Sequence, residues 1–115
     1  MSERSNKVYL EDIAKAAHAI LSYIVDIDFN QFCNDRKTIS ATIRELEIIG
    51  EAVGKISIRL KEKYKTIEWR DIKDMRNILI HEYFGIDHEI IWKVIKKDIP
   101  GLLNVVTEML IKEFP

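Results

Sequence analysis

The sequence predicts an all-α fold, an antiparallel bundle of four main helices with short helical pieces between them. Hydrophobic residues make up 47% of the 115 residues and charged residues 32%, with only four glycines and two prolines. This composition favours helices over a disordered or turn-rich chain. Apolar residues also recur at steps of three and four, as on the buried face of a helix. The length suits a single domain over residues 1–115, with residues 1–6 frayed.

Two long amphipathic segments occupy the N-terminal half. The first runs from Val8 to about Val25, and the second from about Arg36 to Lys63. Between them, Asp28 and Gln31 have the spacing of a capping box, which predicts a short helix through Phe32. Short connections of this kind favour antiparallel neighbours.

The C-terminal half predicts three further helices. The third begins near Trp69, with Thr66 as a candidate cap, and ends at Gly85, which can adopt a positive φ. Asp87 caps a fourth helix, and Pro100 suits the first turn of a fifth. The residues expected to face the core are Ile72, Met75 and Leu79, then Ile90, Ile91, Val94 and Ile95, then Leu103, Val106, Met109 and Leu110.

Composition and charge limit the classes of function. The single Cys33 cannot form an internal disulfide, and no apolar run is long enough for a secretory or membrane-spanning segment. We therefore expect a cytoplasmic protein with no membrane contact. Because the net charge is −1, contact with nucleic acid would need a local basic patch. The best candidate in the sequence is the run Lys55, Arg59, Lys61, Lys63 and Lys65, although such a run is more often a solvated helix end.

Four chemically versatile residues fall within eight positions: Arg76, Asn77, His81 and Tyr83. On a continuous helix Arg76 and His81 are offset by about 140°. They can therefore meet around one phosphate through the reach of Arg76, through a distorted last turn, or through a second copy of the helix. We favour the second copy, because a two-fold interface brings the same surface of both subunits together.

These residue types suit cleavage of RNA. Arginine holds a phosphate through two parallel hydrogen bonds, and histidine exchanges protons near neutral pH. RNA supplies its own nucleophile, the 2′-hydroxyl, so the chemistry requires no metal and no cofactor. The alternative is that Arg76 and His81 are surface residues near a helix end, paired with neighbouring acids. A metal site built from Asp74, His81, Asp87 and His88 would need spacings that a helix does not bring together.

The segment around these residues resembles a known family. Arg76, His81 and Tyr83 match the R-x4-H-x-Y motif of the HepT-like toxins of the HEPN superfamily, and the likeness extends over residues 36–52, 75–87 and 90–102. The resemblance implies an all-α HEPN bundle and a homodimer with the motif at its interface. It also implies a metal-independent endoribonuclease that acts as the toxin of a type VII toxin–antitoxin pair.

The resemblance also implies roles for single residues. Arg76 would bind and polarise the phosphate, His81 would be the general acid or base, and Asn77 would orient one of them. Tyr83 would accept AMP from a cognate minimal nucleotidyltransferase antitoxin of the MNT type. Arg44 and Glu51 of the second long helix would line the same groove or form a buried ion network. Two alternatives remain: a non-catalytic nucleotide-binding or substrate-binding subunit of a two-component nucleotidyltransferase, and a plain dimeric helical scaffold.

Overall fold

The computed structural model describes residues 3–74 and 87–115, and every regular element in these two ranges is helical. The predicted all-α fold is confirmed. The elements in chain order are α1 (Glu3–Tyr23), α2 (Phe29–Cys33), α3 (Arg36–Lys55), α4 (Ile58–Lys63), a helical segment over residues 69–74, α6 (His88–Lys93), the π-helix η1 (Val94–Asp98) and α7 (Ile99–Glu113).

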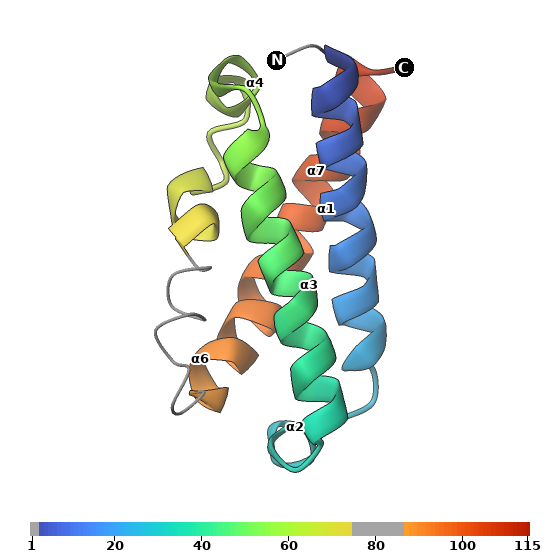
Figure 1. The fold of residues 1–115 in the computed structure, drawn as a ribbon, viewed down its shortest axis with the longest axis vertical. Helices are drawn as coiled ribbons and strands as arrows, with labels where there is room; N and C mark the ends of the chain where they lie inside the picture. The colour runs from blue at the N-terminus through green and yellow to red at the C-terminus, as the bar shows by residue number, and fades with distance from the viewer. Residues whose placement is uncertain (1–2, 75–86) are drawn as a thin grey trace.

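The core lies where α1 packs against both α3 and α7. Figure 1 shows that α3 and α7 run antiparallel to α1, so that α1 begins and α7 ends at the same end of the bundle. Each fully buried Leu or Ile stabilises the fold by about 1.5–3 kcal/mol. The largest fully buried side chains are Leu10, Ile13, Ile20, Phe32, Leu46, Ile49, Val53, Leu60, Ile95, Ile99, Leu102 and Met109.

The start of α1 differs from the sequence prediction. The helix begins at Glu3, so residues 3–6, which were expected to be frayed, are helical. Asn6 is only 2% exposed. Its side chain accepts a hydrogen bond from the Ser57 N–H at 3.1 Å and donates one to the Ser57 hydroxyl at 3.3 Å. These two bonds attach the first turns of α1 to the beginning of α4.

The predicted helix over residues 36–63 is interrupted. It begins at Arg36 as expected but ends at Lys55, and Ile56 is extended with φ −69° and ψ 139°. Ser57 then caps α4, its hydroxyl accepting a hydrogen bond from the Leu60 N–H at 3.4 Å. The spacing of apolar residues hides this break, because Ile56 and Leu60 are four apart and both are buried.

The third helix begins at residue 69 as predicted, and its described part ends at 74. The Ile72 N–H donates to the Glu68 carbonyl at 3.2 Å, so Glu68 occupies the cap position that the sequence suggested for Thr66. The remaining predictions for this helix, at Met75, Leu79 and Gly85, lie outside the described residues.

The last two predicted helices form one continuous helical run over residues 88–113. At η1 the Ile99 N–H bonds to the carbonyl of Val94, five residues earlier. Such a wide turn accommodates Pro100, which has no N–H to donate and whose ring would crowd an ordinary α-helical turn. Ile91 and Ile95 face the core as expected, but Ile90 is 40% exposed, so that prediction was wrong.

Candidate active site

The four motif residues, Arg76, Asn77, His81 and Tyr83, lie outside the described residues, and their mutual geometry stays a prediction. The structure does describe both flanks of the motif. The helical segment over 69–74 leads into it, and α6 follows it. The way in which each flank is attached to the bundle therefore limits where the motif can lie.

Buried aromatic contacts hold the leading flank. Trp69 is 8% exposed, and its indole Nε1–H donates to the Tyr64 carbonyl at 3.0 Å. The Tyr64 hydroxyl in turn donates to Glu113, near the end of α7, at 3.0 Å. Hydrogen bonds from Lys63 and Tyr64 hold the pKa of Glu113 below its ordinary value. The segment that leads into the motif is thus tied to the C-terminal end of α7.

The following flank is held by a helix cap and by aromatic packing. The Asp87 carboxylate accepts the N–H groups of Glu89 at 3.0 Å and Ile90 at 3.2 Å, so the predicted cap of the fourth helix is confirmed. Within α6, the Trp92 ring lies 5.1 Å from the Phe32 ring of α2, centroid to centroid. Such pairs add about 0.5–1.5 kcal/mol beyond burial. The helix that follows the motif is therefore packed against α2.

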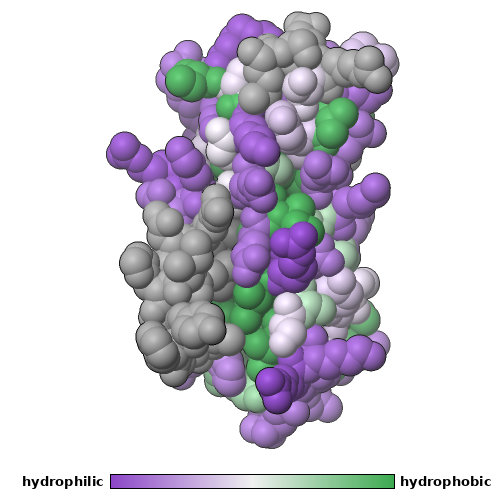
Figure 2. All heavy atoms as spheres, viewed as in Figure 1, coloured by the Kyte–Doolittle hydropathy of each residue, from purple (hydrophilic) through white to green (hydrophobic). Residues whose placement is uncertain are grey.

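Arg44 and Glu51 lie on one face of α3, because residues seven apart differ by only about 20° around a helix. Both are exposed within the single chain, with side-chain accessibilities of 71% and 59%. Arg44 is 3.9 Å from Glu47, and Glu51 is 3.7 Å from Lys55. Figure 2 shows hydrophobic side chains at the surface in patches along the middle of this face, and Ile43 and Ile48 of α3 are only partly buried. Within one chain this face therefore presents both charged and apolar groups to solvent.

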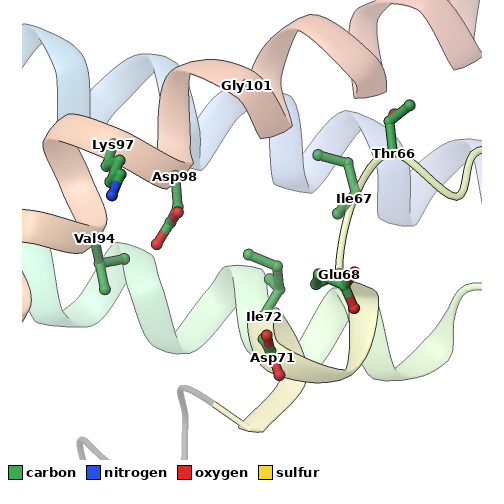
Figure 3. A pocket seen from close by; sticks show the side chains of 9 residues that line it. All are labelled: Thr66, Ile67, Glu68, Asp71, Ile72, Val94, Lys97, Asp98 and Gly101. Carbon is green, nitrogen blue, oxygen red and sulfur yellow. The ribbon is translucent and has the colours of Figure 1, made fainter.

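A cavity of about 460 Å³ separates the leading flank from η1 and α7 (Figure 3). We call it the acidic pocket, because Glu68, Asp71 and Asp98 line it and, among the described residues, Lys97 is the one cation in its lining. Excess carboxylate repels phosphate, so this pocket is unsuited to RNA. No group of three or more histidine, cysteine or acidic side chains in the described part of the chain is arranged to hold a metal ion.

A second pocket, of about 600 Å³, lies on the other side of the same flank. We call it the basic pocket, because Lys61 of α4 meets Arg70 and Lys73 there, and Trp69 and Asp74 also line it. Burial lowers the pKa of the Lys61 amine, and the positive charge of Lys73 lowers it further. The basic run identified in the sequence includes Lys61, but it does not include Arg70 or Lys73. Their spacing of three on a helix was the available signal.

The rest of the predicted basic run is dispersed. The Lys55 amine lies 3.7 Å from Glu51, and the Lys63 amine lies 3.1 Å from Glu113. Their charges are thus partly balanced by carboxylates on the protein.

In the ranges that the structure describes, no helix is long and apolar enough to cross a membrane.

Comparison with known proteins places these features in context. The family model described as "Ribonuclease HepT-like" matches residues 13–109. A protein named "Probable ribonuclease HepT" from Thermococcus cleftensis is 48% identical over 100 residues, 87% of this chain and 91% of the relative. The "Putative RNase MJ1380" of Methanocaldococcus jannaschii is 44% identical over 102 residues, 89% of this chain and 94% of that protein. No solved structure matches the chain.

Proposed function

This chain belongs to the ribonuclease HepT-like family, and on that premise we propose that it is a metal-independent endoribonuclease, the toxin of a type VII toxin–antitoxin pair. The observation that carries the proposal is the extent of the family match. Residues 13–109 include the whole motif from Arg76 to Tyr83 together with both described flanks. The match spans 94% and 91% of the length of the two relatives, and both relatives are named as ribonucleases.

The chemistry is transfer of a phosphoryl group within the RNA. The 2′-oxygen attacks the adjacent phosphorus, a 2′,3′-cyclic phosphate forms, and the bond to the 5′-oxygen of the next nucleotide breaks. His81 accepts the proton of the 2′-hydroxyl while water protonates the leaving oxygen, or His81 donates a proton to the leaving oxygen while water accepts that of the 2′-hydroxyl. Arg76 holds the phosphate and stabilises the charge that develops on its free oxygens.

A homodimer would complete this site. A two-fold contact through the motif would set Arg76 of one subunit beside His81 of the other, which overcomes their separation on a single helix. Asn77 would orient His81 or the phosphate. Arg44 and Glu51 are exposed on one face of α3, which supports the proposal that they line a groove covered by a second copy. The partly buried Ile43 and Ile48 of the same helix support this arrangement, and Figure 2 shows hydrophobic patches on this face of the molecule.

Modification of Tyr83 would provide the regulation. Residues seven apart fall on nearly one line of a helix, so AMP on the Tyr83 hydroxyl would carry its phosphodiester anion close to Arg76. The added charge and bulk would exclude RNA. The partner would be an antitoxin of the minimal nucleotidyltransferase type that transfers AMP from ATP. Accordingly, Tyr83→Phe should still cleave RNA but resist neutralisation, whereas unchanged neutralisation with AMP transfer would place the acceptor elsewhere.

Cleavage by matched histidine variants tests the proposed activity. With a chelator present, the wild-type chain should cut RNA, and His81→Ala should lower the rate by about 10²–10⁴-fold, the usual contribution of a general acid or base. His18→Ala is the control, because His18 is exposed on α1, far along the chain from the motif. Cleavage unaffected by His81→Ala would contradict the mechanism. Nucleotide binding without any cleavage would favour a binding subunit of a nucleotidyltransferase.

A further inference from the structure

The basic pocket gathers cations from two separate parts of the chain. Lys61 comes from α4, while Arg70 and Lys73 are three apart on the helical segment that leads into the motif. Among the described residues that line the pocket, these three cations are accompanied by one carboxylate, that of Asp74. No ion pair joins Lys61, Arg70 or Lys73 to any residue in the described ranges, whereas Lys55, Lys63 and Lys112 each have an acidic neighbour. The pocket therefore holds a local excess of positive charge on a chain whose net charge is −1.

The position of these cations is set by the fold. Lys61 lies in the last turn of α4, the short helix that Ser57 caps and that Leu60 anchors in the core. Lys73 lies over α3: a Cβ atom built on Gly54 would meet its Cε carbon at 3.7 Å. Trp69, the buried anchor of the leading flank, forms part of the pocket wall. The folded chain thus keeps Lys61 and Lys73 close together although like charges repel.

The proximity of Lys61 and Lys73 carries a free-energy penalty. Burial of Lys61 and the charge of Lys73 both lower the pKa of the Lys61 amine, so the charged form is disfavoured in the free protein. An anion bound between the two amines would relieve that repulsion. Loss of either positive charge should therefore leave the fold intact, which makes neutralising substitutions useful tests.

We infer that the basic pocket of Lys61, Arg70 and Lys73 is a binding site for the backbone phosphates of the RNA strand next to the point of cleavage. This inference rests on the proposed ribonuclease function. Arg76 follows Lys73 by three residues, so covalent geometry keeps their Cα atoms within about 11 Å of each other. A strand whose reacting phosphate is held by Arg76 has neighbouring phosphates within reach of long lysine and arginine side chains.

The pocket should recognise phosphate rather than bases. Its polar groups are two ammonium groups, a guanidinium and one carboxylate, and the indole N–H of Trp69 is already bonded to the Tyr64 carbonyl. Ammonium groups act on phosphate as point charges and do not select among bases. The site would therefore increase affinity for any strand and leave the choice of cleavage site to other residues.

The salt dependence of binding tests this inference. The probe is a fluorescent single-stranded oligoribonucleotide of mixed sequence, and the protein is the full chain with His81→Ala so that the probe stays intact. Adding Lys61→Gln and Lys73→Gln should weaken binding at low salt. It should also lower the slope of log K against log salt by about 0.7 for each lost phosphate contact. An oligodeoxyribonucleotide of the same sequence should lose a similar slope, because its phosphates are the same.

Two exposed lysines at other places provide the matched control. Lys7→Gln with Lys37→Gln makes the same change in net charge on α1 and at the start of α3, and it should leave the slope unchanged. If the double substitution in the pocket impairs folding, Lys73→Gln alone repeats the test, because Lys73 is exposed. An unchanged slope with RNA still bound would contradict the proposed phosphate-binding site but not the proposed ribonuclease function. A wild-type chain that neither binds nor cuts RNA would overturn both.

Discussion

The two sides of the helical segment 69–74 carry opposite charge. Arg70 and Lys73 line the basic pocket, whereas Asp71, with Glu68 just before the helix, lines the acidic pocket. On a helix these two pairs fall on nearly opposite faces. Trp69 and Ile72 fall between them and are buried. The segment can therefore present only one of these two exposed faces to an anionic strand. Its buried face fixes the orientation of the segment and so the direction in which each pocket opens.

The largest expected effect comes from removing Trp69, the buried anchor of the helical segment whose two exposed sides line the two pockets. Trp69→Ala should lower the free energy of unfolding by about 3–5 kcal/mol, because it leaves a cavity in the core. Trp69→Phe should cost less, since it keeps most of the packing and loses mainly the bond to the Tyr64 carbonyl, worth about 1 kcal/mol. Urea unfolding measures both. A Trp69→Ala variant as stable as the wild type would show that the segment is not anchored as described.

A smaller and pH-dependent effect on stability is expected when the hydrogen bonds between Glu113 of α7 and residues Lys63 and Tyr64 are removed. The pKa of Glu113 is lowered in the folded chain by hydrogen bonds from Lys63 and Tyr64. Its stabilising contribution is therefore present above the ordinary carboxyl pKa and is lost as the pH falls through the lowered folded value. Glu113→Gln should destabilise the protein at neutral pH, and the difference should shrink in acid.

Thermal unfolding between pH 7 and pH 3 measures this difference. The control is Glu62→Gln, which removes the same charge from an exposed position on α4. A Glu113→Gln variant whose loss of stability is the same at both ends of the range would contradict the assignment of this carboxylate as a pH-dependent tie.

The smallest effect is expected on the acidic side. Asp71→Asn removes one negative charge from the face that we do not expect to contact RNA. Cleavage at moderate salt should change by less than about twofold, because exposed charges are screened beyond about 10 Å. Initial rates on a labelled RNA measure this. A large loss of activity in Asp71→Asn would mean that RNA or a reacting group contacts the acidic pocket, and the comparison of the two faces would be reversed.

Local signals in the sequence predicted much of the fold. The capping box of Asp28 and Gln31 has both of its hydrogen bonds, at 2.8 and 2.9 Å, and Asp87 caps α6. Apolar spacing also located the buried faces of α1, α3 and α7. These features depend on residues within four positions of each other, where helix geometry leaves little freedom.

The features that the sequence did not predict depend on longer-range contacts or on competing local ones. The break before Ser57 is supported by Asn6, 51 positions away, and no helical pattern contains that information. At η1 the apolar spacing continues through a π-helix, so Pro100 looked like the start of a new helix. The basic pocket brings Lys61 and Lys73 together from the two sides of the loop between α4 and residue 69. The two residues are not part of one run of charges in the sequence, so the run alone does not connect them.

The site itself was predicted from residue types, which suggested phosphate binding by Arg76 and proton transfer by His81, and from family resemblance, which alone suggested that Tyr83 accepts AMP. The spacing of Arg76 and His81 leaves three ways for them to meet, and a dimer is favoured because a two-fold interface brings the same surface of both subunits together. Membership of the HepT-like ribonuclease family supports the activity, whereas the shared site and the AMP acceptor Tyr83 remain proposals.

Complementation between two inactive variants tests the shared site most directly. Arg76→Ala and His81→Ala, each inactive alone, are unfolded together and refolded as a mixture. If Arg76 of one subunit works with His81 of the other, each mixed dimer holds one intact pair, and the mixture should recover roughly a quarter of wild-type cleavage. A mixture that forms mixed dimers but stays as inactive as either variant would contradict the account.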